Sequence, residues 1–290
     1  MPNKKVSEKN EPRVKKISFR EKTIAYVELM RLGNCVMAAI AVLIGFFLAQ
    51  GMNYFTAFYA AFSALMICGA GQAINDYFDA KIDAKTSKQR PIPSGRITKQ
   101  EALWFSIILF FIGIIISFTV NTTTAFMALL LSILLIAYPL LLNKTKYLGN
   151  VIVALGTAVT FVFGSAATGT IPLLVIVLSI SAFFSNMARE ITKDIEDIRK
   201  DKGTKLTLPM IIKCAKQFVY AYYIVAIVLS LAAFVWFGLN YYYLAFALIG
   251  ASVFIQAMLL LYNNSPKKSQ KVSKAGMIAS LVAFVFAGFK

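Results

Sequence analysis

The sequence predicts an all-α integral membrane protein, and three observations carry that prediction. The first is composition: 59% of the 290 residues are hydrophobic, 15% are charged and the mean hydropathy is +0.70. Soluble domains are nearer to half apolar and a quarter charged. The second observation is a series of nine apolar stretches, and the third is the way in which charge is divided between their connections.

Each apolar stretch has about the 20 residues that a helix needs to cross a bilayer. The nine predicted spans cover 33–50, 54–74, 102–120, 124–142, 148–168, 171–188, 216–237, 241–262 and 273–289. They take up most of the chain, so we expect one transmembrane domain over residues 17–290. Residues 1–16 are polar and basic, and we expect them to be disordered. Residues 17–31 mix charged and apolar positions, which predicts a helix lying along the membrane interface.

Charged and uncharged connections alternate strictly along the chain. Of the 30 Lys and Arg residues, all but Lys290 lie in 1–32, 75–101, 143–147, 189–216 and 263–274, together with all 13 acidic residues. The other connections carry no charge. Because basic residues gather in cytoplasmic loops, we expect a multi-pass protein of the cell membrane with a cytoplasmic N-terminus. The net charge of +17 is then mainly topological, and we expect no nucleic-acid partner.

The residue inventory excludes several kinds of catalysis. The chain has no histidine, which removes Ser-His-Asp and Cys-His catalysis, histidine-ligated metals and imidazole proton relays. The three cysteines, Cys35, Cys68 and Cys214, are too widely spaced for a zinc site or a disulfide framework.

Two aspartate triplets share one spacing. They are Asp76, Asp79 and Asp83 in the first, and Asp194, Asp197 and Asp201 in the second. Residues at i, i+3 and i+7 lie on one face of a helix. Each triplet follows the cytoplasmic end of an even-numbered span, in segments about 75–101 and 189–215 that we expect to cap the membrane domain from the cytoplasm.

Three carboxylates on one helix face repel one another, and a divalent cation reverses that effect. Mg²⁺ prefers oxygen ligands and is commonly held by one or two carboxylates plus substrate phosphates. Two facing triplets therefore predict a site for two Mg²⁺ ions and a diphosphate. The alternative is that the acids merely solvate loop helices, and that is what we expect of Glu190 and Glu196, which do not share the spacing.

The residues around both triplets resemble the UbiA superfamily of intramembrane prenyltransferases. The first triplet, preceded by Asn75 and followed by Arg-Pro-Ile-Pro-Ser-Gly at 90–95, is similar to the first signature of that family. The second triplet, followed by Thr-Leu-Pro at 207–209, resembles its second signature. Tyr138-Pro139, with Gly149-Asn150 beyond it, resembles the family's short loop after the fourth helix. The Arg31-x-x-Asn34 pattern before the first span also fits.

The resemblance implies nine helices around a central cavity and transfer of a prenyl group from a prenyl diphosphate to a lipophilic or aromatic acceptor. It implies that both triplets bind Mg²⁺, with Asp194 alternatively a supporting residue. It implies that the diphosphate is oriented by Asn34, Asn75, Arg90 and Lys193. We expect Tyr138 to stabilise the cation-like carbon, or else to be an interfacial anchor.

The pattern at 189–209 most resembles the branch of the family that makes archaeal ether lipids. That branch transfers a geranylgeranyl group from geranylgeranyl diphosphate to geranylgeranylglyceryl phosphate. We expect the acceptor phosphate to contact some of the residues Lys81, Lys144, Lys146, Arg189, Lys202 and Lys205. For each of them singly, charge that sets the membrane topology is the competing explanation.

Two other functions are open at this point. An aromatic prenyltransferase acting on a hydroxybenzoate or quinone precursor would use the same diphosphate site. A transporter is disfavoured because no acidic or basic residue lies deep in a predicted span, where transporters place ionisable groups. The sequence indicates membrane lipids as surroundings and no obligatory protein partner.

Overall fold

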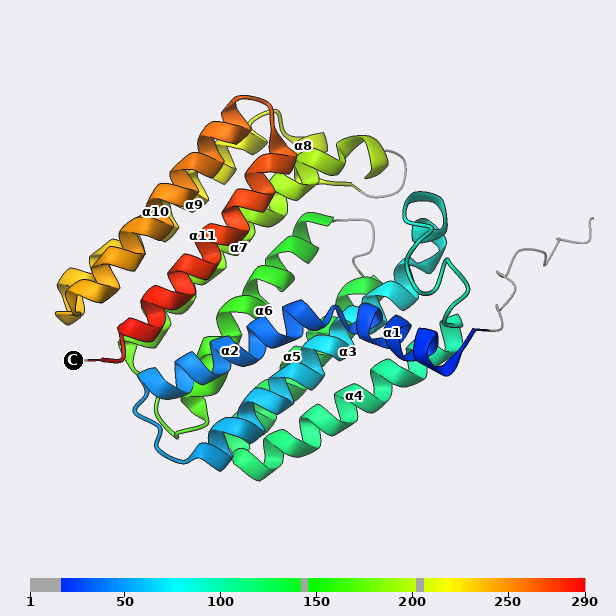
Figure 1. Ribbon diagram of the computed structural model, residues 1–290, viewed down its shortest axis with the longest axis horizontal. Coiled ribbons are helices and arrows are strands. Elements are labelled where there is room, and N and C mark those ends of the chain that lie inside the picture. Colours follow the sequence, from blue (N-terminus) through cyan, green and yellow to red (C-terminus); the bar gives the residue numbers. More distant parts are fainter. Residues whose placement is uncertain (1–16, 142–145, 202–205, 290) are drawn as a thin grey trace, which may run out of the picture.

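The computed structural model describes residues 17–141, 146–201 and 206–289, without the side chains of 141, 146 and 199–201. Eleven helices run through these residues (Figure 1). They are α1 (Phe19–Met30), α2 (Leu32–Leu48), α3 (Tyr54–Thr86), α4 (Lys99–Val120), α5 (Thr122–Leu141), α6 (Lys146–Ala166), α7 (Leu173–Asp201), α8 (Leu208–Ile211), α9 (Ala215–Phe237), α10 (Tyr241–Tyr262) and α11 (Pro266–Phe286). The predicted disordered segment, 1–16, lies outside the described residues.

The all-α prediction is confirmed, and a helix stands at each of the nine predicted spans. Seven of the described helices are long and apolar enough to cross a membrane, and the bent pair α1 and α2 together would be an eighth. The helix at the ninth predicted span, α11, begins with the polar run Pro-Lys-Lys-Ser-Gln-Lys and is apolar only in its second half. The count of nine crossings therefore stays a prediction.

The helix predicted at 17–31, before the first span, is α1, and its position along the membrane interface stays a prediction. A capping box starts it: the Ser18 hydroxyl accepts from the Glu21 amide, and the Glu21 carboxylate accepts from the Ser18 amide. The helix ends at Arg31, whose φ of 51° is left-handed. There the chain bends by 51° into α2. A left-handed non-glycine residue costs about 1 kcal/mol or more, so the surrounding structure must favour this bend.

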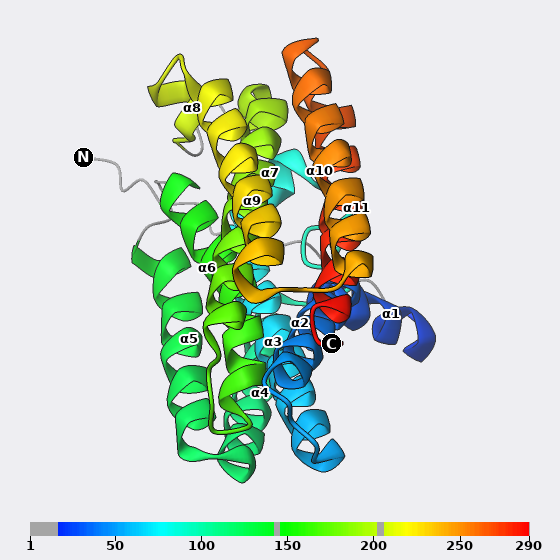
Figure 2. The ribbon, with the colours of Figure 1, turned by 90° about the vertical axis from the view of Figure 1, so that its left-hand side faces the viewer.

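Helices α2 and α6 pack closely against each other (Figures 1 and 2). Gly45 of α2 lies against the backbone of Phe161, and Gly164 of α6 lies against the backbone of Val42. A methyl group at either glycine would stand 2.0 Å or less from a carbonyl oxygen. The missing side chains thus let the two backbones pack directly on each other.

The aspartate triplets lie on helices and not in loops. Helix α3 runs for 33 residues and α7 for 29, which is longer than the roughly 20 residues that a bilayer requires. In the two expected capping segments, 75–101 and 189–215, residues 75–86 and 189–201 continue α3 and α7, and their capping role stays a prediction. No glycine or proline, the two residues that most disfavour a helix interior, lies in 72–86 or 173–201, so both helices can continue through the triplets.

The connection between α3 and α4, residues 87–98, folds compactly against α1 and is called the cap below. Ile92 and Ile97 are 5% and 1% exposed and pack with Ala25 and Leu29 of α1. The Arg96 guanidinium donates to Glu28 of α1 at 2.6 Å. This cap fixes the backbone on either side of Arg90, whose carbonyl oxygen accepts from the amide of Ser94.

Candidate active site

A cavity of about 480 Å³ lies at the centre of the helices. Within the described residues, α2, α3, α5, α6, α7 and α11 line it, and α4, α9 and α10 contribute no lining residue. The expected arrangement of nine helices around a cavity is thus refined to six inner and three outer helices. The lining is polar beside the aspartate triplets and apolar farther along, where Leu131, Phe163 and Phe284 stand.

The first triplet is buried on one face of α3. Asp76, Asp79 and Asp83 are 4%, 6% and 6% exposed, and Asp79 and Asp83 line the cavity. Two arginines neutralise much of this charge. Arg31 donates to Asp76 at 2.7 Å, and Arg90 donates to Asp83 at 2.5 Å and to Asp76 at 3.4 Å.

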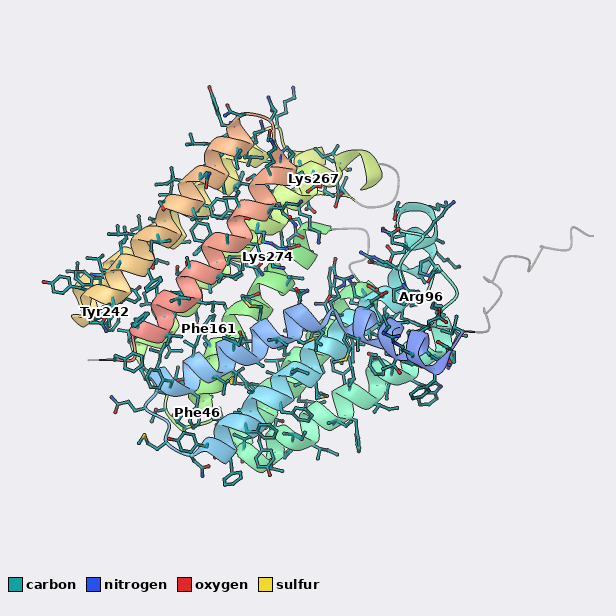
Figure 3. The ribbon with its side chains drawn as sticks, in the orientation of Figure 1. Phe46, Arg96, Phe161, Tyr242, Lys267 and Lys274 are labelled. Carbon is teal, nitrogen blue, oxygen red and sulfur yellow. The ribbon has the colours of Figure 1, made fainter. Side chains whose placement is uncertain are left out.

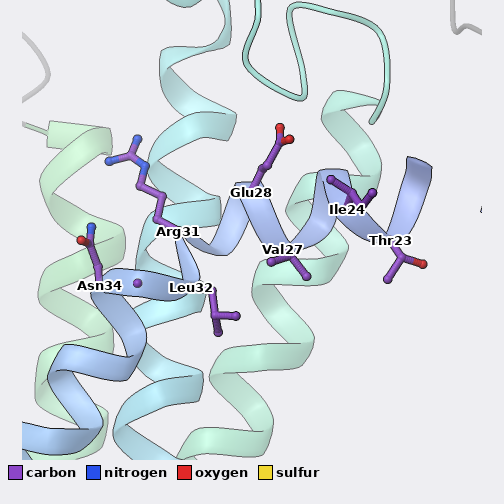
Figure 4. Close-up of a pocket in the computed structure, with 8 residues that line it drawn as sticks. Thr23, Ile24, Val27, Glu28, Arg31, Leu32 and Asn34 are labelled. Carbon is purple, nitrogen blue, oxygen red and sulfur yellow. The ribbon is translucent and has the colours of Figure 1, made fainter. Parts of the chain in front are cut away.

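Both arginines are positioned by their backbones. The left-handed conformation of Arg31 ends α1 and turns its side chain toward α3, and Figure 4 shows Arg31 and Asn34 projecting to the same side while Leu32 projects to the other. Arg90 is part of the cap that packs against α1, and its backbone is fixed there. Burial opposes its charge, but the neighbouring Asp76 and Asp83 carboxylates outweigh this and raise the pKa of Arg90. It stays cationic throughout the working pH range.

The second triplet has a different environment. Asp194 is fully buried, and its Oδ2 accepts from the side-chain amide of Asn150 on α6 at 2.7 Å. Asp197 lines the cavity and Asp194 does not. The side chain of Asp201, the third predicted ligand, lies outside the described residues. The supporting role considered for Asp194 agrees with this placement, although its role stays a prediction.

A compact charged group stands beside the second triplet. Glu190 accepts from Arg189 at 2.7 Å and lies 3.5 Å from the Lys193 ammonium, and all three residues line the cavity. The expectation that Glu190 merely solvates a loop helix is wrong, because the residue is only 8% exposed. Glu190 occupies the cavity wall and balances two nearby cations.

The structure brings most of the predicted site residues to one cavity. Its lining includes the predicted residues Asn34, Asn75, Asp79, Asp83, Arg90, Tyr138, Arg189, Lys193 and Asp197. Lys81 is exposed and does not line the cavity. The side chains of the other predicted acceptor contacts, Lys144, Lys146, Lys202 and Lys205, lie outside the described residues.

Tyr138 stands at the end of α5 and faces α6. Its hydroxyl lies so close to Gly149 that a methyl group on that glycine would come within 2.0 Å of the oxygen. The glycine of the Gly149-Asn150 pair thus makes room for the tyrosine. This placement in the cavity wall favours a site role over the interfacial alternative.

Several polar residues in the lining were not among the predicted site residues, and three of them bear on the charge of the site: Arg31, Asn150 and Lys274. Arg31 and Asn150 belong to short motifs that the sequence displays, and both hold an aspartate of a triplet. Lys274 belongs to a basic run at the start of α11, and in the sequence it looks like the other lysines that set the membrane topology. Only the fold places it in the cavity.

The donor set fits Mg²⁺ held partly by substrate. Among the described residues, no three acidic or cysteine side chains come close enough to form a complete metal site. Asp79 and Asp83 from α3 and Asp197 from α7 nevertheless present hard oxygen atoms to the same cavity. Mg²⁺ commonly takes one or two carboxylates and completes its shell with phosphate oxygens and water. The cavity is therefore suited to a diphosphate with its metal ions.

Comparison with known proteins agrees with this geometry. Residues 38–282 match the UbiA prenyltransferase family. Digeranylgeranylglyceryl phosphate synthases are similar over 90% of this chain and 96% of their own: that of Methanosphaera stadtmanae is 35% identical over 269 residues, and that of Methanosarcina mazei is 38% identical over 281 residues.

The solved structures give the same result. A structure of digeranylgeranylglyceryl phosphate synthase superimposes with a TM-score of 0.77 at 30% identity, covering 92% of this chain and 99% of that one. A UbiA homolog from Archaeoglobus fulgidus, bound to DMAPP and Mg²⁺, superimposes with a TM-score of 0.68 at 17% identity and covers 89% and 98%; it shares the fold. The protein is a multi-pass membrane enzyme, and the chain belongs to the UbiA prenyltransferase family.

Proposed function

We propose that this enzyme transfers a geranylgeranyl group from geranylgeranyl diphosphate to geranylgeranylglyceryl phosphate and so forms the second ether bond of archaeal membrane lipids. The observation that carries the proposal is the meeting of the two aspartate motifs, from α3 and α7, at one cavity with an apolar continuation. The synthase names of relatives that are 35% and 38% identical over nearly the whole chain support this acceptor.

The polar end of the cavity suits the donor diphosphate. Asp79, Asp83 and Asp197 are the residues that would hold Mg²⁺, which when bound neutralises the leaving diphosphate as its negative charge develops. Arg90 and Lys193 add positive charge at the same end, where a fork-shaped guanidinium and a point-like ammonium both suit phosphate oxygens. Asn34 and Asn75 provide neutral amides that orient the diphosphate.

The apolar part of the cavity suits the prenyl chain and the reacting carbon. Breaking the allylic C–O bond develops positive charge on carbon, which water would quench. Apolar walls such as Leu131, Phe163 and Phe284 exclude water from this region. Tyr138 lines the cavity at the polar end of α5, and its ring would stabilise the cation-like carbon with its π-electrons.

The glycerol hydroxyl of the acceptor then bonds to that carbon and loses its proton, while diphosphate leaves. Arg189 is the one predicted acceptor contact among the described residues that lines the cavity. Its guanidinium is already bonded to Glu190, so this pair presents less free charge than the sequence suggested.

We further propose that the polar end of the cavity faces the cytoplasm, because the charged connections all lie on that side. In a background without the native cysteines, Lys88→Cys should react with an impermeant thiol reagent only from the cytoplasmic side. Met52→Cys, on the opposite connection and 84% exposed, should react only from outside. The reverse pattern would overturn the orientation.

A product assay tests the reaction itself. Purified enzyme with Mg²⁺ and geranylgeranyl diphosphate is offered geranylgeranylglyceryl phosphate in one arm and a hydroxybenzoate in the other. The expected product is the glyceryl phosphate carrying two geranylgeranyl ethers. Efficient prenylation of the hydroxybenzoate with no reaction of the glyceryl phosphate would overturn the proposed acceptor and leave the family assignment intact.

A further inference from the structure

The five cations of the cavity lining differ in how they are paired. Arg31 and Arg90 bind the first triplet, while Arg189 and Lys193 lie against Glu190. Lys274 of α11 makes no ion pair or hydrogen bond with any described residue that lines the cavity. Within the described part of the chain, it is therefore the lining cation whose charge is available to a ligand.

Lys274 also stands at the head of an apolar stripe. Met277, Leu281 and Phe284 follow it on α11 at i+3, i+7 and i+10 and line the same cavity. These spacings place all four side chains on one face of the helix. One end of the stripe is thus cationic and the rest is apolar.

Helix α2 presents a matching stripe to the cavity. Asn34 lies at its polar end, and Met37, Ala38 and Ala41 follow on the same face. Each of the two helices therefore offers one polar residue and then an apolar wall. This pattern is complementary to an amphiphile with an anionic head and a hydrocarbon tail. The donor diphosphate already has its own partners on α3 and α7.

We propose that Lys274 binds the phosphate of the glyceryl phosphate acceptor and selects for a phosphorylated head group. The inference rests on the proposed function and names a residue that determines its acceptor specificity. The acceptor tail lies along the apolar stripe of α11, and the glycerol end faces the diphosphate site. Figure 3 shows Lys274 part-way along α11, whereas Lys267 lies near the beginning of that helix.

The matched test compares two lysine substitutions on one helix. Lys274→Gln should raise the acceptor KM about tenfold, the low end for a charge-assisted phosphate contact because Lys274 is solvent-exposed. The KM for geranylgeranyl diphosphate should change less than twofold, and Lys274→Arg should recover most of the loss. Lys271→Gln removes the same charge one turn away, at an exposed position outside the lining, and should leave both constants unchanged.

A head-group comparison separates phosphate recognition from a general effect on the cavity. Wild-type enzyme should prefer geranylgeranylglyceryl phosphate over unphosphorylated geranylgeranylglycerol, and Lys274→Gln should lose most of that preference. An unchanged preference in the variant, or a rise in the KM of the donor instead, would overturn the role of Lys274. Wild-type enzyme that ignores the glyceryl phosphate altogether would overturn the proposed function, which the product assay detects independently.

Discussion

Two aspartates of the α3 triplet accept hydrogen bonds from arginines, whereas Asp194 of the α7 triplet accepts one from an amide. Asp76 and Asp83 receive hydrogen bonds from Arg31 and Arg90, so two cations already oppose three carboxylates. Asp194 receives its bond from neutral Asn150. Equal spacing in sequence thus gives equal geometry along a helix but different hydrogen-bond donors to the two triplets.

The difference indicates a division of labour between the two motifs. The α3 triplet is braced by its own connection and by the junction of α1 and α2, so its geometry is set before any ligand binds. The α7 motif has Glu190 beside it, and Glu190 is balanced by Arg189 and Lys193. We expect changes at the first motif to affect stability and turnover together, and changes at the second to affect turnover more selectively.

The largest effect is expected where both motifs reach the cavity. Asp79→Asn and Asp197→Asn should each lower turnover about 100- to 1000-fold, the range for losing one preorganised electrostatic contact. Prenyl transfer to the acceptor measures this. Glu196→Gln, on α7 but outside the cavity lining, should retain activity. Wild-type turnover should vanish in EDTA, and undiminished turnover in EDTA would contradict a metal–diphosphate site.

The next largest effect is expected on stability, from the arginine that holds the α3 triplet. Arg90→Gln leaves the buried Asp83 without its charged partner and should lower the free energy of unfolding by about 3 kcal/mol, the low end for a broken buried pair. The melting temperature in detergent should fall by several degrees. Lys88→Gln, at an exposed position in the same connection, is the control. Equal melting temperatures for the two variants would show that Arg90 does not brace α3.

A smaller effect is expected at the corresponding contact of α7. Asn150→Ala removes one neutral donor from the buried Asp194 carboxylate and should cost about 1.5 kcal/mol, the low end for a hydrogen bond to a charged group. The same melting experiment measures it. A loss as large as that of Arg90→Gln would contradict the contrast drawn between the two motifs.

Much of the architecture could be predicted because membrane crossing leaves a strong mark on sequence. The length of the apolar stretches predicted the helices. The i, i+3, i+7 spacing within each aspartate triplet, which begins at Asp76 or Asp194, predicted that the triplet lies on one helix face. The spacing could not show that α3 and α7 each continue as a single helix, over 33 and 29 residues. A bilayer sets the minimum length of a span and leaves its continuation to local propensity.

The site was harder to complete from sequence because pairing is a property of the folded chain. Glu190 breaks the repeated spacing, and its burial between Arg189 and Lys193 follows only from the packing of α7. Lys274 has the same composition around it as Lys271, yet only Lys274 lines the cavity. From the sequence alone, the two lysines could not be assigned different roles.

The central claim is that the motifs of α3 and α7 act on one diphosphate, and a double-mutant cycle tests it most directly. Binding of a non-reactive thiolo analogue of geranylgeranyl diphosphate is measured with Mg²⁺ for wild type, Asp79→Asn, Asp197→Asn and the double variant. Residues that share one bound ligand and its metal ions are coupled. The account predicts that the double variant binds little worse than either single variant. Strictly additive losses in binding free energy would contradict a shared site.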